Sequence, residues 1–561
     1  MVTDGLGNVS WTDISSAIDT VGWLLKGNSG TDPVSNFVGT TDNQPLKFRI
    51  LNQASGVIDS IYSSTALGYK ALSLYPSSAT QNTAIGYKAL ISNSTGTKNT
   101  AVGSDAGANN SSGDNNVFLG YFAGAANTDA TRNTIIGSVA GAFNNGSNNT
   151  FIGSQTGFFN TSGTLNTFIG SGAGEANTEG GNNTFIGTAA GVNNTLGNRN
   201  TFVGRSAGRL NTTADYNTAI GFESLYSQSF NNLNTIYYTG NTAIGYQSLY
   251  NTNPTNINNG NRNTAMGFQN MLANTTGSGN TSIGFQSMIT NTTGIGNVAI
   301  GDVSLVSNTS GSSNVAIGNG AAYENTIASS NTVIGTDALR NNTTASQNVA
   351  IGRLALSAQD FTNGNVPYSS YNVAVGSFAL EANNPTSNSD GRFNVGIGTS
   401  SFRSNIIGTD NSGLGTNSGY YALGSYNTYI GSYSGFGATG TNLGVANSTL
   451  GSRSLFSVTT GSDNVAIGNT AMYSNTIGAN NVAIGAGAAY ANTTSSFNVA
   501  VGVSALRLQS FNNSGAQYNT FNVAVGTYAL EANNPTSNAN GSLNVGIGTS
   551  SFRSNIIGTD N

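Results

Sequence analysis

The chain offers few side chains that could perform catalysis or bind a metal. Its 561 residues include no cysteine and no histidine, so there is no thiol nucleophile, no zinc knuckle and no imidazole base. A glycosidase needs two carboxylates about 5–10 Å apart, whereas the glutamates outside the first 200 residues are scattered along the chain. We therefore expect no enzyme, no bound metal and no cofactor. These glutamates are Glu223, Glu324, Glu381 and Glu531.

Charge is scarce as well, with 18 Lys and Arg, 23 Asp and Glu, and a formal net charge of −5. This balance supplies no basic field for nucleic acid or for an anionic membrane surface. No run of 18 apolar residues exists, which argues against a membrane span. The opening residues 1–5 lack a basic region and an apolar region, so we expect no secretory signal there.

Three aromatic clusters remain as candidates for binding. Aromatic side chains suit sugar stacking or protein contact. The clusters are therefore candidate receptor-contact loops, and the receptor would be a cell-surface glycan or protein. The alternative is that they pack on the next part of the chain or on a neighbouring chain. The clusters are Phe230, Tyr237 and Tyr238; Phe361, Tyr368 and Tyr371; and Phe511, Tyr518 and Phe521.

A short internal repeat must position these clusters. A motif of the form Asn-Thr/Val-Ala/Phe-Ile-Gly recurs from residue 63 onward, and its closing glycine occurs 27 times between Gly68 and Gly548. Of the 26 intervals between these glycines, 16 are 17 residues long. Intervals of 24 and then 22 residues occur together at 221–267, 352–398 and 502–548. Each aromatic cluster lies in one of the three 24-residue intervals.

A 17-residue unit is too short for a helical pair, and its Gly, Asn and β-branched residues form helices poorly. The unit fits two short strands and two turns, as one coil of an all-β parallel β-solenoid, or β-roll, of about 27 coils. Stacking such coils places equivalent asparagines above one another, so their amides are expected to form ladders. Residues 377–411 recur almost unchanged at 527–561, and we expect the repeat to continue beyond residue 561.

The strands are apolar on both faces. The residue before each glycine, such as Ile85 or Ile152, is apolar and is expected to point into the coil. The residue one step earlier is then expected to face outward, and it is also apolar, for example Ala84 or Phe151. A strand that is apolar on both faces is buried on both, so we expect the outward face to pack against other copies of the chain in a homotrimer.

These motifs resemble two groups of fibrous proteins. Asn-Val-Ala-Ile-Gly, as at 314–318 and 464–468, resembles the β-roll heads of trimeric autotransporter adhesins. The longer unit, as at 280–288, is similar to repetitive tail-fibre proteins of phages and bacterial injection systems, and residues 22–46 are similar to a segment that precedes such repeats. The resemblance implies a trimeric fibre on a virion, an injection particle or a cell surface.

The expected organisation follows from these observations. Residues 1–62, which hold Trp11 and Trp23, form an N-terminal cap or attachment region with a short helix near 13–18 and a strand near 46–51. Residues 63–561 form the solenoid, with loops at the long intervals. We expect a non-enzymatic fibrous adhesin or tail fibre that acts outside the cell. The alternative is a self-assembling extracellular filament, or an ice-binding solenoid, without a specific receptor.

Overall fold

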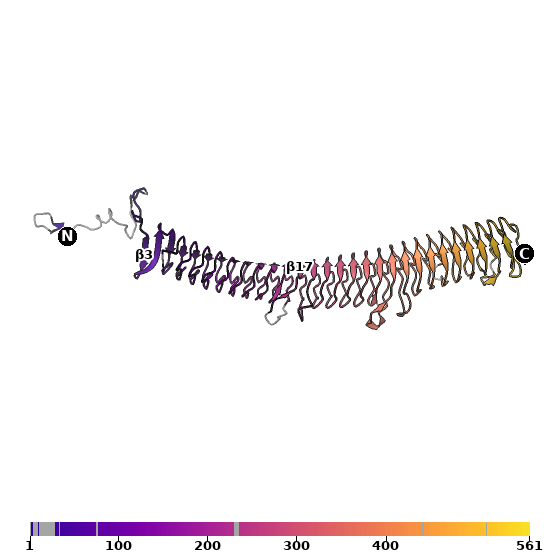
Figure 1. Ribbon diagram of the computed structural model, residues 1–561, viewed down its shortest axis with the longest axis horizontal. Coiled ribbons are helices and arrows are strands. Elements are labelled where there is room, and N and C mark those ends of the chain that lie inside the picture. The colour runs from indigo at the N-terminus through magenta and orange to yellow at the C-terminus, as the bar shows by residue number, and fades with distance from the viewer. Residues whose placement is uncertain are drawn as a thin grey trace. The chain divides into compact units, whose positions relative to one another are not determined.

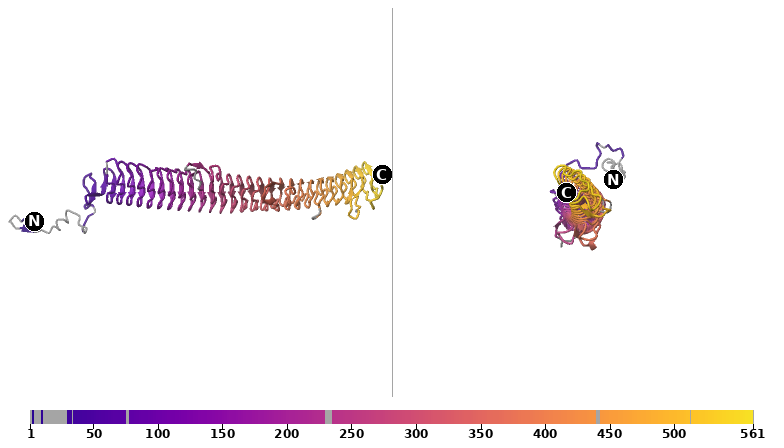
Figure 2. Two further views of the ribbon diagram at one scale, coloured as in Figure 1. Left: turned by 90° about the horizontal axis from the view of Figure 1, so that it is seen from below. Right: turned by 90° about the vertical axis from the view of Figure 1, so that its right-hand side faces the viewer.

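The computed structural model describes residues 2–3, 9–10, 29–32, 34–74, 77–228, 235–438, 442–511 and 513–560. The expected helix near 13–18 and both tryptophans lie outside these residues. The chain forms two compact units, residues 1–155 (unit 1) and residues 156–561 (unit 2). In each unit short strands stack into successive coils, as Figures 1 and 2 show.

Unit 1 begins with an antiparallel pair and then turns into a stack of parallel strands. Strand β4 runs antiparallel to both β3 and β5, whereas β5 to β10 pair in parallel. The expected strand near 46–51 is therefore confirmed as β3. The strands of unit 1 are β1 (Val2–Thr3), β2 (Val9–Ser10), β3 (Leu46–Ile50), β4 (Gln53–Asp59), β5 (Ser64–Leu67), β6 (Thr83–Ile85), β7 (Thr100–Val102), β8 (Val117–Leu119), β9 (Thr134–Ile136) and β10 (Thr150–Ile152).

Unit 2 continues the pattern with 21 main strands of three residues within its described part. They are β11 (Thr167–Ile169), β12 (Thr184–Ile186), β13 (Thr201–Val203), β15 (Thr218–Ile220), β17 (Thr242–Ile244), β18 (Thr264–Met266), β19 (Thr281–Ile283), β20 (Val298–Ile300), β21 (Val315–Ile317), β22 (Thr332–Ile334), β24 (Val349–Ile351), β26 (Val373–Val375), β27 (Val395–Ile397), β28 (Ser412–Leu414), β29 (Thr428–Ile430), β30 (Ser448–Leu450), β31 (Val465–Ile467), β32 (Val482–Ile484), β34 (Val499–Val501), β36 (Val523–Val525) and β37 (Val545–Ile547).

The main strands pair in parallel and in register, so each residue lies above its equivalent in the next coil. In β11 and β12, for example, Thr167 pairs with Thr184 and Phe168 with Phe185. The register persists across coils of different length, since β15 still pairs Ala219 with Ala243 of β17. The expected all-β parallel solenoid with a repeat of about 17 residues is therefore confirmed.

The second strand expected in each coil is absent from the described coils. The residues after the glycine form turns instead, because the second and fourth of them have left-handed backbones. In one coil these are Lys88 (φ 54°) and Leu90 (φ 49°). The turns still bond from coil to coil, as when the Leu90 amide donates to the Ala106 carbonyl at 3.0 Å. These bonds offset a left-handed strain of about 1–2 kcal/mol per residue.

The expected facing of the strands is reversed in the structure. The middle residue of each strand, such as Ala84 or Phe185, is 0% exposed and points into the coil, whereas Ile85 before the glycine is 39% exposed. Apolar residues occupy both faces, so their pattern alone could not show which face is inward. We call the middle residue the core position, and the residue before the glycine the outer position.

Most described coils hold one large side chain in their interior. The core position lies opposite the fourth residue after the glycine, which we call the facing position. Phe185 at the core position accompanies Gly191 at the facing position, where an added Cβ would lie 2.6 Å from the Phe185 ring. Ala219 instead accompanies Leu225, and both side chains are fully buried. The large side chain can therefore come from either wall of the coil, and in a few coils both positions are small, as in Ala316 with Ala322.

Two buried columns of amides hold the coils together, as the repeat predicted. In the first column the Asn82 side-chain oxygen accepts the Asn99 backbone N–H at 2.9 Å, and its Nδ2 donates to the Gly96 carbonyl at 2.9 Å. In the second, Asn110 Nδ2 donates to Asn93 Oδ1 at 3.0 Å. Buried amides are stable only when they are hydrogen-bonded, so each coil depends on the next.

Candidate functional site

The three long coils each carry a small side sheet in addition to their main strand. The second strand of each side sheet falls in the aromatic cluster, and the main strands keep their register beside it. In Figure 1 these strands, coloured magenta, orange and yellow, lie along one edge of unit 2, below the main strands. The side sheets pair β14 (Ala214–Asp215) with β16 (Tyr237–Tyr238), β23 (Ala345–Ser346) with β25 (Tyr368–Ser369), and β33 (Ser495–Ser496) with β35 (Tyr518–Asn519); a 3-10 turn covers Asn363–Asn365.

One tyrosine of each cluster is an internal anchor. Tyr237, Tyr368 and Tyr518 occupy equivalent positions and are only 4%, 8% and 7% exposed. Burial raises the pKa of Tyr237 and of Tyr518 to about 12, and it raises the pKa of Tyr368. These side chains therefore stabilise the long coils and leave little surface for a ligand.

A glutamine accompanies each anchor tyrosine. Gln228, Gln359 and Gln509 replace the turn asparagine of the second amide column and are buried. Gln509 Nε2 donates to Ser495 Oγ at 2.8 Å and to Thr520 Oγ1 at 3.1 Å. The exchange of Asn for Gln lengthens the amide where the coil widens. This exchange is readable in the sequence and marks all three long coils, but the repeat motif alone did not reveal it.

The other candidate residues are more accessible. Tyr238, Tyr371 and Phe521 are 70%, 43% and 47% exposed. Phe361 and Phe511 are half-buried, and each packs edge-on against the anchor tyrosine of its own loop, with ring centroids 5.6 Å and 5.4 Å apart. Phe230 lies outside the described residues. Each cluster thus combines a buried anchor with at least one exposed ring.

Two of the exposed rings, Tyr371 and Phe521, belong to a column on the solenoid surface. This column holds the residue before each ladder asparagine, which has a left-handed backbone. In the second and third long coils it carries Tyr371 (φ 51°) and Phe521 (φ 53°). Tyr371 stacks on Phe393 with ring centroids 5.3 Å apart, and Phe521 stacks on Phe497 at 5.2 Å. The column is therefore filled by stacked rings at both places.

In the first long coil the same position is Gly240 (φ 57°), and a hollow of about 350 Å³ lies there. Its described lining consists of Tyr216, Tyr238, Thr239, Gly240 and Arg262. The Tyr216 and Tyr238 rings lie 5.4 Å apart at an interplanar angle of 55°, so they form an aromatic corner. Gly240 was not a candidate from the sequence, but aligning the three long coils would have shown that it replaces Tyr371 and Phe521.

The charges around this hollow are mostly positive. Arg199 Nη1 donates to the Tyr216 hydroxyl at 2.8 Å, and its guanidinium lies 5.2 Å from the centre of that ring. Arg262 is exposed at the opposite side. Asp215 is buried and does not line the hollow; its carboxylate accepts the Asn198 backbone N–H at 2.6 Å. Burial raises the pKa of Asp215, although the Asn198 bond lowers it in part.

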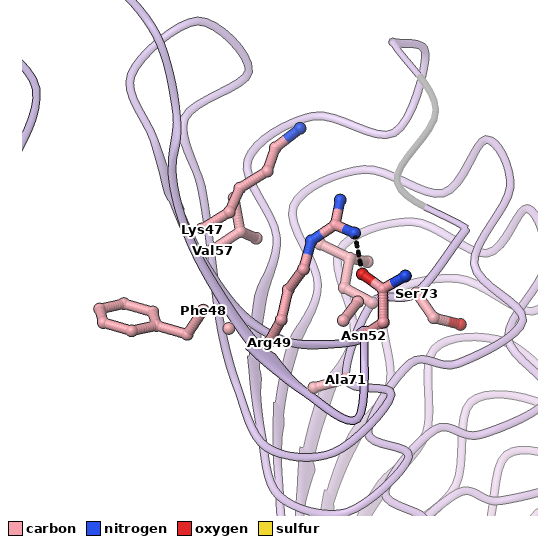
Figure 3. Close-up of a pocket in the computed structure, with 10 residues that line it drawn as sticks. Lys47, Phe48, Arg49, Asn52, Val57, Ala71 and Ser73 are labelled. Carbon is pink, nitrogen blue, oxygen red and sulfur yellow. Dashed lines mark hydrogen bonds between the residues drawn. The ribbon is translucent and has the colours of Figure 1, made fainter.

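A second pocket, of about 220 Å³, lies in unit 1 beside the antiparallel strands β3 and β4. Figure 3 shows Lys47 and Arg49 directed to one side of β3, whereas Phe48 points away. Arg49 Nη1 donates to Asn52 Oδ1 at 2.8 Å, so its charge is already oriented by the protein. Its described lining contains no carboxylate, and its polar side chains are those of Lys47, Arg49, Asn52 and Ser73.

A uniform surface of unit 2 is formed by the outer position together with the first residue of each main strand. All 21 main strands of its described part end in Ile, Val, Leu or Met, none of which is buried, and begin in Thr, Val or Ser. No charged residue lies in either column of these strands. We call this surface the outer apolar stripe. It is a candidate protein–protein interface because large apolar patches mark interaction sites.

Within the described residues we find no cluster of acidic side chains able to hold a metal, and no helix long and apolar enough to cross a membrane. The identifiable features are thus a parallel β-solenoid, an apolar stripe, three anchored loops and one aromatic hollow. No protein-family model matches the chain, and a search of curated proteins finds no match either.

Proposed function

We propose that the chain is a non-enzymatic fibrous protein that assembles as a homotrimer and attaches a particle or a cell to a surface. The observation that carries this proposal is the outer apolar stripe. Twenty coil steps of about 4.8 Å make the stripe roughly 100 Å long. With a width of about 10 Å, the extended side of a three-residue strand, it covers roughly 1,000 Å².

That area favours a partner over exposure to water. The largest apolar patch on a typical monomer is about 300–600 Å², and a stable interface needs about 800 Å² from each partner. A second copy of the chain fits best, because it presents the same uncharged stripe in the same coil spacing. Three copies around a common axis would bury all three stripes together, and we therefore propose a trimer.

Three substitutions on the outer stripe test this assembly. Lysine at Ile283, Ile334 and Ile397 would place charges in the interface, where burial of unpaired charge is costly. Lysine two residues later in each coil, at Phe285, Thr336 and Thr399, is the matched control, because these side chains are exposed beside the same strands.

Sedimentation velocity should give the wild-type and control proteins a mass three times that of the 57.0 kDa chain. The outer-stripe variant should have the mass of a single chain. Circular dichroism would verify that all three proteins keep their β-structure. A wild-type protein that is monomeric at micromolar concentration would contradict the trimer.

The attachment role is supported by the loops of unit 2. Insertions in solenoids form binding surfaces more often than the coils do, and here three long coils present exposed rings on one edge. Such a protein would act outside the cell, on a virion, an injection particle or a cell surface. Retention of the labelled protein on a panel of bacterial cells and cell-envelope polysaccharides tests this role, and absence of retention on the whole panel would contradict it.

The ice-binding alternative is weakened by the composition of the stripe. Ice binding requires a regular array of threonines. In unit 2 the main strands from β11 to β19 all begin with Thr, but the series is broken after β19. Val replaces it in β20, β21, β24 and β26. Valine has no hydroxyl to order water, whereas it packs well in a protein interface. The stripe therefore favours burial against another chain.

A further inference from the structure

We propose that the hollow at the first long coil binds one sugar ring that carries a negatively charged group, as part of an acidic polysaccharide. The inference rests on the attachment role proposed above and names its ligand. The site comprises Tyr216, Tyr238 and Arg262 as contact residues, Gly240 as its floor and Arg199 as a positioning residue.

The shape of the hollow follows from a missing side chain. Tyr216 and Arg262 lie in the same surface column, two coils apart, with Gly240 between them. Two coil steps amount to roughly 10 Å, so the gap corresponds to one absent layer. In the other long coils an aromatic ring fills this layer and stacks at 5.2–5.3 Å on its neighbour. A flat ring of a ligand can take its place here.

The chemistry of the walls selects a sugar. Tyr238 is 70% exposed and Tyr216 is 46% exposed, and their tilted rings offer apolar faces with hydroxyl groups at the rim. Small-ligand sites are concave, largely apolar and equipped with a few polar groups, with volumes of about 300–1,000 Å³. A pyranose ring matches these walls because its C–H face packs on an aromatic ring while its hydroxyls reach the rim.

The charge of the walls selects an acidic sugar. The structure shows no hydrogen bond or ion pair for the Arg262 guanidinium among the described residues, and that guanidinium is exposed at the hollow. A guanidinium binds a carboxylate or a sulfate through two parallel hydrogen bonds. Arg199 is occupied with Tyr216, so it fixes the ring and adds positive potential without being a direct contact.

The matched control lies within the same molecule. At the third long coil the neighbours of Phe521 in the column are Phe497 and Leu543, and neither of these is next to an arginine in the sequence. Replacing Phe521 by glycine should open a hollow of similar shape that lacks a free cation. The contrast between the two coils separates the contribution of shape from that of charge.

Binding is tested with the trimeric full chain and defined sugars. The probes are oligogalacturonate, sialyllactose and a sulfated heparin disaccharide, with methyl-esterified oligogalacturonate and lactose as uncharged controls and an oligoglutamate peptide as the acidic non-sugar. Saturation-transfer NMR and isothermal titration calorimetry measure the affinity of the protein for each probe and each control. We expect at least one acidic sugar to bind, the methyl ester to bind at least tenfold more weakly, and the peptide not to bind.

Three variants locate the site. Gly240→Tyr should abolish binding, because it inserts the ring that Tyr371 supplies in its own coil at nearly the same backbone angle. Arg262→Gln should weaken binding at least tenfold and remove the preference over the methyl ester. Tyr238→Ala should also lose at least tenfold, whereas Phe521→Gly should leave the affinity unchanged.

Each other outcome overturns the proposal. These are binding of none of the acidic sugars, equal binding of the peptide, or a Gly240→Tyr variant that binds as the wild type does. The carboxylated and sulfated probes distinguish the two sources of charge. A protein that is retained on cell envelopes but binds none of the sugars would refute the hollow and leave the attachment role standing. A protein that binds sugar through the hollow but is not retained on any member of the panel would do the reverse.

Discussion

Unit 2 contains two kinds of coil that share one backbone. In β11 to β13 the core position holds Phe168, Phe185 and Phe202, opposite glycine. In β15 to β18 it holds Ala219, Ala243 and Ala265, opposite Leu225, Leu249 and Met271. The strands stay in register across the change, with Phe202 paired to Ala219. Across this change the large side chain moves from one wall of the coil to the other while the backbone stays the same.

The two kinds of coil differ in how their core side chains touch. Phe168, Phe185 and Phe202 stack face to face with ring centroids 4.7 Å and 4.9 Å apart, so Phe185 contacts a ring on each side. The leucines of the other region carry a left-handed backbone, as Leu225 does at φ 49°, where the phenylalanine coils have glycine. One region thus gains ring stacking, and the other bears backbone strain.

Truncating a ring should produce the largest effect. Phe185→Ala would leave a cavity between Phe168 and Phe202, and losses of about 3–5 kcal/mol are usual for such changes. We expect a drop of that size in local unfolding free energy, measured by hydrogen exchange of the amides in β11 to β13. Leu165→Ala, on a side chain 55% exposed just before β11, is the control and should cost less than about 0.5 kcal/mol. Equal losses for the two variants would show that the coil interior does not carry the stability.

Restoring the volume from the opposite wall should recover most of that loss. In Phe185→Ala/Gly191→Leu the coil would have the composition of the Ala219 coil, with leucine at a left-handed position that costs about 1–2 kcal/mol. We expect the double variant to regain about 2 kcal/mol over Phe185→Ala, measured in the same exchange experiment. Gly191→Leu alone should destabilise, because Phe185 already fills the space. Additive losses would mean that the two walls do not exchange volume.

The amide ladder should be indifferent to the kind of coil. Asn183 in a phenylalanine coil and Asn297 in an alanine coil make the same pair of bonds, each donating to a glycine carbonyl at 2.8 Å and accepting the next Asn backbone N–H at 2.9 Å. Replacement of either by alanine should cost about 1–3 kcal/mol, because a buried partner loses its bond. Chemical denaturation measures the free energy of unfolding of the two alanine variants. A difference above about 1 kcal/mol between their losses would show that the two kinds of coil do not have equivalent backbones.

The smallest effect is expected at Asp215, next to the transition between the two regions. Burial raises its pKa above the value of about 3.9 in the unfolded chain. Its stabilising contribution is therefore fully present below that pH and is lost as the pH rises through the raised value. Asp215→Asn, which copies Asn198 of the preceding coil, should remove this dependence. It should stabilise the protein at pH 7 by less than about 1 kcal/mol, since the Asn198 hydrogen bond and the Arg199 charge offset part of the effect of burial.

Urea unfolding at pH 3.5 and pH 7 measures that difference for Asp215→Asn and the wild type. A variant at Asp215 that is less stable than the wild type at neutral pH would contradict the assigned sign.

The sequence predicted the coil period, the position of the main strands and the asparagine ladder, because identical residues recur at identical spacing. It did not predict which strand face is inward, since Ala84 and Ile85 are both apolar. It also missed the turns after the glycine, because leucine at a left-handed angle is rare and has no sequence signature of its own. The hollow at Gly240 depends on the residues of three successive coils, which only their alignment or the structure brings together.

The in-register ladder has a consequence for how such a gene can change. Each coil bonds only to its neighbours, so whole coils can be duplicated or deleted without disturbing the rest. The near-identity of residues 377–411 and 527–561, which are 150 residues apart, is the mark expected of such a duplication. Eight coils lie within that interval, and copying them once would add roughly 40 Å to unit 2. Recombination between copies could thus adjust the reach of the protein in fixed steps, with the same loops carried along.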